Sequence, residues 1–154
     1  HTLAGICRAG KSDCGGLSIL CVSALRANGV PARVLVGRFA RPGDKNQPIK
    51  VDQLKFDDYG GQHAMAEFFA FGVGWVPVDM AAGLADPSAT GAESFGRERG
   101  QFLTLHIDTD LDLDTVYFGR HTFLVLQSPT ASPKGTGKYD GVSRKETWEV
   151  RKLR

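Results

Sequence analysis

Three side chains that suit covalent catalysis by a thiol occur along the chain in the order Cys14, His63 and Asp79. A nucleophile, a base and a carboxylate that orients the base are the three parts of such a catalyst. The cysteine stands just before a helical stretch, the histidine opens a strand-like stretch, and the aspartate ends another. This order and these settings predict an enzyme that acts on amide or ester carbonyls.

The surroundings of Cys14 favour its reactive form, which is the thiolate. Asp13 is predicted to cap the following helix, so the sulfur would lie at a helix N-terminus, where the dipole and unpaired N–H groups stabilise an anion. Gly15 and Gly16 leave room beside the sulfur for a substrate carbonyl. The backbone N–H of Cys14 would form part of an oxyanion hole. The charge of Asp13 opposes the thiolate unless its side chain points away as a cap.

His63 would take the thiol proton and later protonate the leaving amine, while Asp79 would fix the tautomer and orientation of the imidazole. Further candidates for contact with an oxyanion or a substrate are Gln62, Gly15 and Trp75. Gln62 directly precedes the base and carries an amide donor. For Trp75, a position in the core is favoured over a role as a substrate platform.

The contact between base and carboxylate depends on the register of a predicted hairpin. A three-residue turn at residues 72–74 places Asp79 opposite Glu67. Because side chains alternate along a strand, Glu67 lies on the same face as His63. Asp79 would then share that face but lie four residues away along the ladder. Contact requires a bulge or a wider loop shifted towards residues 69–71, and Pro77 favours a bulge or an edge position.

The remaining pattern predicts an α+β fold with a mostly antiparallel sheet, because one helix precedes several strands without repeated alternation. The helix, residues 17–28, is apolar nearly all round, as in a buried helix. The predicted strands are 33–39, 62–71, 75–80, 102–107, 115–118 and 121–126, with shorter ones at 49–51 and 147–150. Loops are expected over residues 40–61 and 81–100.

The length of 154 residues predicts a single domain that covers residues 1–154. Its core is expected over residues 7–127, followed by a linker or surface loop at 128–141 and an edge strand with a basic tail at 142–154. The chain begins at His1 without a methionine, so it is expected to be an excised part of a longer protein. The sequence indicates neither the compartment nor the oligomeric state.

Composition excludes several classes of protein. Hydrophobic residues make up 42% and charged residues 23%, which is ordinary for a globular domain. A net charge of +2 gives no argument for binding nucleic acid, and no apolar run approaches the ~20 residues that span a bilayer. The expected partner is a protein or peptide substrate.

No metal or cofactor is predicted. The three cysteines, at positions 7, 14 and 21, are odd in number and match no zinc pattern. Aspartates at 108, 110, 112 and 114 alternate like calcium ligands, but leucines stand at 111 and 113, so a solvated strand face or loop is favoured. Cys21, His106 and His121 are expected to be structural.

Three blocks of sequence give the chain a family resemblance. They are residues 13–33, which end in GVPAR, residues 63–67 (HAMAE) and residues 74–79 (GWVPVD). In this order they resemble the transglutaminase-like superfamily, within the papain-like cysteine enzymes. The chain departs from that pattern at Met65, where many members carry Trp, and in the long polar loop at residues 40–61. The resemblance covers about half of the chain.

The resemblance implies that Cys14 is the nucleophile, His63 the base and Asp79 the orienting residue, with a thioester acyl-enzyme as intermediate. It does not choose the acceptor, because the superfamily includes protein cross-linkers, amidases, peptidases and members without activity. Hydrolysis of a peptide or amide is favoured over cross-linking, since no site for a lysine-like amine is recognised. The alternatives are a non-catalytic binding or scaffold module that keeps the fold, and a thiol redox site that uses Cys7 and Cys14.

Overall fold

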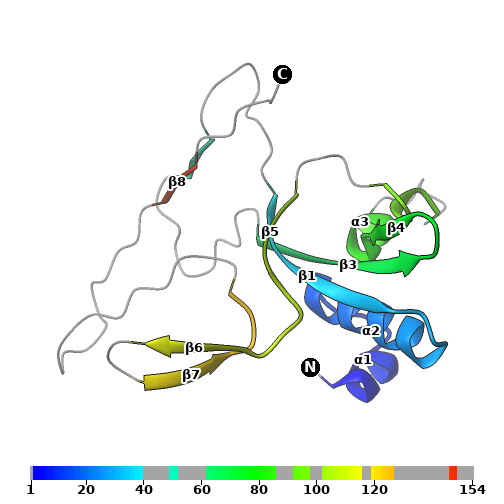
Figure 1. The fold of residues 1–154 in the computed structure, drawn as a ribbon, viewed down its shortest axis with the longest axis horizontal. Coiled ribbons are helices and arrows are strands. Elements are labelled where there is room, and N and C mark those ends of the chain that lie inside the picture. Colours follow the sequence, from blue (N-terminus) through cyan, green and yellow to red (C-terminus); the bar gives the residue numbers. More distant parts are fainter. Residues whose placement is uncertain are drawn as a thin grey trace.

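The fold is α+β, and every described pair of strands is antiparallel (Figure 1). The computed structural model describes residues 2–39, 49–51, 62–85, 92–97, 102–115, 119–126 and 146–148. Its elements are α1 (Leu3–Ala9), α2 (Cys14–Ala27), β1 (Ala32–Phe39), β2 (Ile49–Val51), β3 (Gln62–Ala70), β4 (Gly74–Val78), α3 (Met80–Ala85), a 3-10 turn (Ala92–Ser94), β5 (Phe102–Ile107), β6 (Leu111–Thr115), β7 (Gly119–Phe123) and β8 (Glu146–Trp148).

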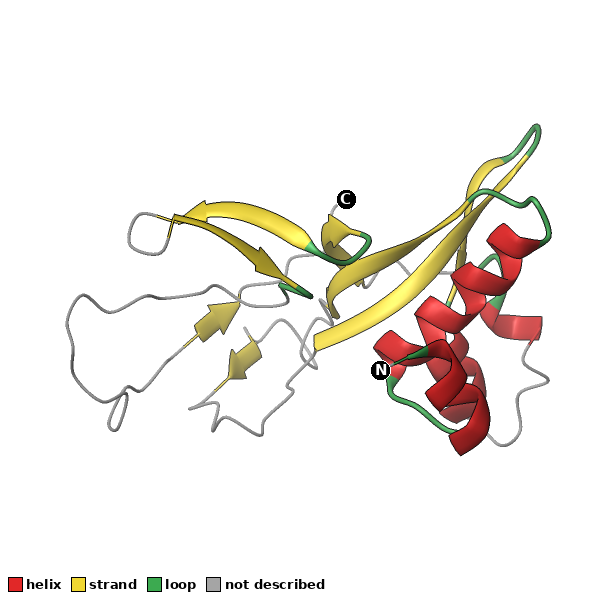
Figure 2. Ribbon diagram, turned by 90° about the horizontal axis from the view of Figure 1, so that it is seen from below, coloured by secondary structure: helices red, strands yellow, loops and turns green. Residues whose placement is uncertain are grey.

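The largest sheet has the strand order β4-β3-β1-β5, with β3 and β1 at its centre. Helices gather on one side of it, as Figure 2 shows. There α2 packs on β1 and β3, while α1 and α3 both pack on α2. Valine and alanine side chains fill the core between α2 and the sheet: Val22, Ala32, Val34, Val36, Ala64, Ala66 and Val78. Small and β-branched residues suit this closely packed face.

The strands β6 and β7 pair with each other, and β2 pairs with β8, so each pair forms its own small sheet. The predicted strands at 33–39, 49–51 and 102–107 are confirmed to within one residue. Residues 116–118, most of the predicted strand 115–118, lie outside the described residues, as do the predicted linker at 128–141 and the basic tail. The predicted strand 121–126 begins two residues earlier, at Gly119, and ends at Phe123.

The helix that carries Cys14 begins earlier than the apolar pattern predicts. Asp13 is its N-cap, with its carboxylate accepting a hydrogen bond from the Gly16 N–H at 2.8 Å. Within α2 only Gly16, Ser18 and Val22 are buried. The expectation of a helix buried nearly all round is therefore wrong. Because α2 lies on one face of the sheet, its far side is covered only in part by the described elements.

Two helices occur where none was predicted. The first is α1, which packs on α2 and carries Cys7 at an exposed position. The second is α3, which occupies the start of the expected loop at 81–100. Both are short, at seven and six residues, and the packing of their apolar residues on α2 stabilises helices that would be marginal alone.

The loop of the β3–β4 hairpin lies one residue earlier than predicted, at residues 71–73, and this shifts the register of the two strands by two residues. The N–H of Val73 donates to the carbonyl of Ala70 at 3.0 Å, which closes a four-residue turn. Gly72, the third residue of this turn, has a φ of 81°, a left-handed conformation that glycine adopts without strain. Gly74, which pairs with Ala70 where the ladder begins, also has a positive φ, of 102°, so both glycines shape this turn.

The shifted turn changes which residues face each other. Glu67 pairs with Pro77 and not with Asp79, as the predicted register had it. Continued by two residues, the observed register brings Asp79 opposite Met65, two residues closer to His63. The ladder is regular at Pro77, so a bulge at that residue is wrong, while its edge position is confirmed because β4 ends the sheet. The loop keeps three residues and is not wider, and its shift brings the two side chains together.

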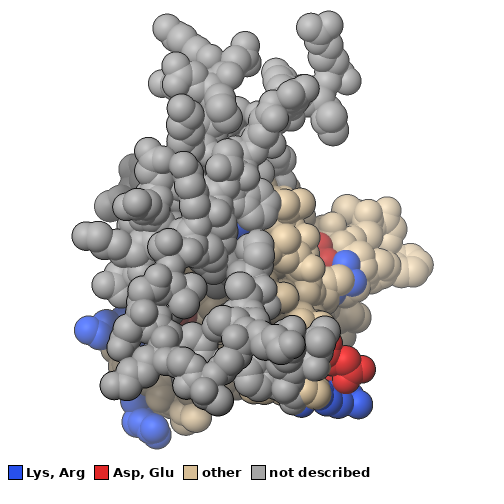
Figure 3. Space-filling view, turned by 90° about the vertical axis from the view of Figure 1, so that its left-hand side faces the viewer, with Lys and Arg blue, Asp and Glu red and all other residues tan. Residues whose placement is uncertain are grey.

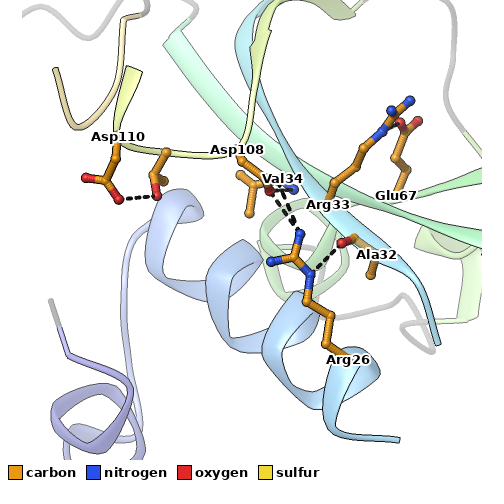
Figure 4. A network of polar contacts seen from close by, with 8 residues as sticks. Arg26, Ala32, Arg33, Val34, Glu67, Asp108 and Asp110 are labelled. Atoms are coloured by element: carbon orange, nitrogen blue, oxygen red, sulfur yellow. Dashed lines mark hydrogen bonds and ion pairs between the residues drawn. The ribbon is translucent and has the colours of Figure 1, made fainter. Parts of the chain in front are cut away.

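A polar clasp joins the end of α2 to β1 and to the end of β5 (Figure 4). The Arg26 guanidinium contacts both carboxylate oxygens of Asp108, at 3.2 and 3.3 Å, and donates to the Ala32 carbonyl at 2.7 Å. Asp108 also accepts a hydrogen bond from the Val34 N–H at 3.0 Å. It has a φ of 59°, a conformation that aspartate tolerates better than most residues. This clasp holds α2 against the sheet at the end of the helix that lies far from Cys14.

Among the described residues, no helix is long and apolar enough to cross a membrane. On the face drawn in Figure 3, the described basic and acidic side chains lie at separate places and do not form one large patch of either sign. The prediction that nucleic acid is not a partner remains untested.

Candidate active site

Cys14 is the first residue of α2, and its thiol lies half-buried against the core. The Asp13 carboxylate accepts a hydrogen bond from the Gly16 N–H, and the Asp13 carbonyl accepts one from the Leu17 N–H at 3.0 Å. For the N–H of Cys14 itself, the described part of the chain offers no acceptor. This N–H is one of the donors that every helix start leaves without an intrahelical partner.

His63 and Asp79 are in direct contact. The Nε2 atom of His63 lies 2.8 Å from Oδ2 of Asp79, and both side chains are nearly buried, with exposed fractions of 10% and 12%. His63 is the second residue of β3, and Asp79 follows the last residue of β4. A hydrogen bond between two nearly buried groups directs Nε2 of the imidazole towards Asp79.

Asp79 is itself held by the start of α3. Its Oδ1 atom accepts a hydrogen bond from the Ala82 N–H at 2.9 Å, and its carbonyl accepts from the Gly83 N–H at 3.1 Å, so Asp79 is the N-cap of this helix. Its own N–H donates to the Ser94 carbonyl at 3.0 Å. The two carboxylate oxygens thus have separate partners, one in α3 and one in His63.

The ionisation of the three groups is coupled. Hydrogen bonding to His63 lowers the pKa of the Cys14 thiol, an effect that burial opposes and the backbone amide of Ala64 assists. Burial disfavours a charged His63, but hydrogen bonds to Asp79 and Cys14 outweigh it and raise the pKa of His63 to about 9. Burial likewise opposes ionisation of Asp79, yet hydrogen bonds from His63 and the α3 backbone lower its pKa. These shifts favour a thiolate beside an imidazolium.

Ser18 connects the helix of the cysteine to the strand of the histidine. Its hydroxyl is buried and lies 2.7 Å from the carbonyl oxygen of Cys14 and 3.1 Å from that of Ala64, the residue after His63. The single hydroxyl proton is shared between these two acceptors. This contact fixes the spacing of α2 and β3 at the point where the thiol and the imidazole meet.

The comparisons with known proteins bear on the same part of the chain. Residues 1–80 match the family described as the transglutaminase-like superfamily. The chain belongs to the transglutaminase-like superfamily. The matched region contains Cys14, His63 and Asp79, and it ends one residue into α3.

The chain is similar to an uncharacterized protein of Haemophilus influenzae, with 36% identity over 80 residues. The alignment covers 46% of this chain and 21% of that protein, so the chain spans about a fifth of the relative that it matches. No solved structure matches significantly. The transglutaminase-like match is consistent with a cysteine-based enzyme family, and the relative, being uncharacterized, adds no activity.

The two glycines after Cys14 differ in their surroundings. A Cβ atom on Gly16 would lie 1.9 Å from the Ser12 hydroxyl oxygen and 3.1 Å from Cδ1 of Ile6. Gly16 is therefore required for the packing of α2 on the segment before it, rather than for access to the sulfur. A Cβ atom on Gly15 would meet only the Asp13 carboxylate, at an ordinary 3.6 Å. Gly15 remains the candidate that leaves room for a substrate.

The other predicted contact residues lie at different distances from this site. Gln62 begins β3 beside His63, and by alternation its side chain lies on the face that packs on α2. Trp75 pairs with Phe69, six residues along β3 from His63, which is roughly 20 Å away. It is 41% exposed, so its expected position in the core is wrong. The Arg33 guanidinium carbon lies over the Trp75 ring, 3.9 Å from the ring centroid.

The metal alternative gains no support from the described residues, which contain no group of three or more His, Cys, Asp or Glu side chains able to hold an ion. Asp112 on β6 forms an exposed ion pair with Arg120 on β7, at 2.7 Å. Asp108 forms the ion pair with Arg26 described above. All three cysteines are free thiols, and Cys7 is exposed. A bridge between Cys7 and Cys14 is not formed.

Three residues near the site were not predicted from the sequence. The first is Ser18, whose spacing of four residues from Cys14 places both on one face of the helix and was the available signal. The others are Phe39 and Phe102, whose rings contact His63. They come from strands distant in sequence, and no local pattern indicated them.

Proposed function

We propose that this chain is a cysteine-dependent enzyme that cleaves amide bonds through a thioester acyl-enzyme, with Cys14 as nucleophile, His63 as base and Asp79 as its orienting residue. The observation that carries this proposal is the position of His63, which bonds to Asp79 at 2.8 Å and hydrogen bonds to the Cys14 thiol. The proposal extends to a papain-like core, in which a helix with the nucleophile at its start packs on an antiparallel sheet.

In the first half of the reaction, the Cys14 thiolate attacks the carbonyl carbon and the carbonyl oxygen becomes an oxyanion. The unpaired N–H of Cys14 is placed to donate to this oxygen. As the tetrahedral intermediate collapses, the C–N bond breaks and imidazolium His63 gives its proton to the leaving amine. The carbon–sulfur bond that has formed is the thioester.

In the second half, an acceptor attacks the thioester carbonyl and neutral His63 takes the acceptor's proton. The C–S bond then breaks, and the thiolate returns beside the imidazolium. With water as acceptor the product is a carboxylate, and with a primary amine it is a new amide. We favour water, because among the described residues no site for a lysine-like amine is evident.

The experiment that tests this function is the capture of the acyl-enzyme. The protein is mixed, under reducing conditions, with peptides that carry an activated acyl group, and the intact mass is measured over time. We expect an acyl adduct that maps to Cys14, that decays in water, and that is absent from Cys14→Ala. The matched control is Cys21→Ala, which removes another half-buried thiol of the same helix and should retain the adduct.

The outcomes separate the competing functions. Decay of the adduct that accelerates on addition of a small primary amine, with amide as product, indicates transfer instead of hydrolysis. A folded protein that acquires no adduct at Cys14 from any acyl donor contradicts the proposal and favours a non-catalytic module with the same fold. Reversible oxidation of Cys14 together with Cys7 would instead support a redox role.

A further inference from the structure

Aromatic rings from two neighbouring strands enclose His63. The ring of Phe39, on β1, stacks on the imidazole with centroids 4.4 Å apart and an angle of 26° between the planes. Phe102, on β5, approaches the imidazole edge-on at 6.0 Å and packs against Phe39 at 5.9 Å. The three rings form one cluster across β3, β1 and β5, beside the contact between His63 and Asp79.

The backbone is shaped to admit this cluster. Gly37 is the residue of β1 that pairs with His63, and the β1–β5 ladder shifts register between Val36 and Gly37. A Cβ atom on Gly37 would lie 2.0 Å from the Leu103 carbonyl oxygen and 3.1 Å from Cζ of Phe102. The missing side chain thus lets β5 approach closely and lets the Phe102 ring occupy the space beside His63.

We propose that Phe39, supported by Phe102 and by the space that Gly37 leaves, is a positioning residue that holds the His63 imidazole in the plane in which Nε2 meets Asp79. This inference deepens the proposed function and rests on it. The second torsion of a histidine side chain is broad, so one hydrogen bond fixes the direction of Nε2 better than it fixes the plane of the ring. A stacked aromatic ring supplies the second constraint.

Phe39 has a second effect, on charge. The titratable groups that interact with His63 in the described residues are Asp79, after β4, and Cys14, at the start of α2. Both favour the imidazolium. The electron-rich face of Phe39 also favours a cation stacked on it. Loss of the ring should therefore weaken both the orientation and the protonated state of the base.

The test compares Phe39→Leu, which removes the ring but keeps an apolar side chain, with Phe39→Tyr, which retains the ring. The matched control is Phe123→Leu, because Phe123 packs edge-on against another histidine, His121, at 4.8 Å and away from the site. In each protein the imidazole signals of His63 are followed by NMR as a function of pH, and alkylation of Cys14 is timed at pH 6.

In Phe39→Leu we expect the His63 titration midpoint to fall by roughly half a unit to one unit. The signals of His63 should lose the shift caused by the neighbouring ring. Alkylation of Cys14 should slow about fivefold. Phe39→Tyr should behave as the unaltered protein does, and Phe123→Leu should change only His121. Thermal unfolding of each variant shows whether it remains folded, and if Phe39→Leu does not, the comparison is made with Phe39→Met.

An unchanged His63 titration and unchanged imidazole shifts in a folded Phe39→Leu protein would overturn the positioning role, whatever Cys14 does. The proposed function fails separately, if Cys14 in the unaltered protein forms no acyl adduct. His63 would then still respond to Phe39 by NMR, so the two failures are distinguishable. A loss of alkylation without any change at His63 would also contradict the inference, because Phe39 would then act through stability alone.

Discussion

Cys14 and Cys21 lie two turns apart on one helix and are both half-buried, yet their thiol pKa values shift in opposite directions. Burial alone raises the pKa of Cys21, as expected for a sulfur in apolar surroundings. At Cys14 the hydrogen bond to His63 overcomes the same effect. The difference between the two thiols is therefore made mainly by one side chain, His63, with a smaller effect of the Ala64 backbone. Cys21 thus serves as an internal control for Cys14.

The first prediction concerns selective alkylation. At pH 6 to 7, Cys14 should react with iodoacetamide roughly tenfold faster than Cys21, because a larger fraction of it is thiolate. Peptide mass spectrometry of samples quenched over time measures both rates in one protein. In His63→Ala the advantage should disappear. Equal rates at the two cysteines in the unaltered protein would show that the thiol and imidazole do not form a pair in solution.

The second prediction is the pH dependence of turnover. The rate should rise with pH as Cys14 ionises, below the ordinary range of a thiol, because its pKa is lowered. It should fall again near pH 9, where His63 loses the proton that the leaving amine needs, since the pKa of His63 is raised to about 9. Alkylation of Cys14 should not fall there, because the thiolate persists. A parallel loss of alkylation and turnover above pH 9 would contradict this assignment.

The third prediction separates the two roles of Asp79. Asparagine can cap α3 as aspartate does, but it offers His63 no charge and can present the wrong atom to Nε2. Asp79→Asn should therefore reduce turnover roughly 10²- to 10⁴-fold with little loss of stability. Asp79→Ala should also lower the free energy of unfolding by about 1 kcal/mol, through the lost cap. Denaturant unfolding and steady-state kinetics on both variants check this.

The fourth prediction distinguishes the two glycines after the nucleophile. Gly16→Ala forces a Cβ atom to within 1.9 Å of the Ser12 hydroxyl and should cost about 1–3 kcal/mol of stability. Gly15→Ala meets no such neighbour and should gain up to about 1 kcal/mol from helix propensity. If Gly15 leaves room for the substrate, the same variant should lose turnover despite its stability. Full activity in Gly15→Ala would remove Gly15 from the site.

The central part of the fold could be predicted from the sequence because its signals are local. The Asp13 cap, the apolar run and the stop at Asn28–Gly29 define α2 within three residues, and alternation defines β1 and β3. The hairpin register was wrong by two residues, since either Gly72 or Gly74 could provide the left-handed turn position. In the structure both glycines have a positive φ, and Gly74 pairs with Ala70, a register that brings Asp79 to His63.

Other features of the site could not be predicted because they depend on contacts between distant segments. The stacking of Phe39 and Phe102 on His63 needs three strands in register, and the bulge opposite Gly37 has no sequence signature of its own. The start of α3 could have been recognised, because Asp79 precedes an alanine-rich run that suits a helix. The interpretation of Asp79 as an orienting residue obscured its second role as a cap.

The pairing of β5 with β1 has a consequence for where this fold can be cut. The family match ends at residue 80, but β5, the Asp108 clasp and nearly all of α3 come after it. A fragment truncated there would leave β1 as an exposed edge strand with unpaired amides, open to pairing with another chain. It would also keep the nucleophile, base and carboxylate while losing the α3 backbone that bonds to Asp79 and the Phe102 ring beside His63. We therefore expect the smallest unit that folds on its own to extend beyond residue 80.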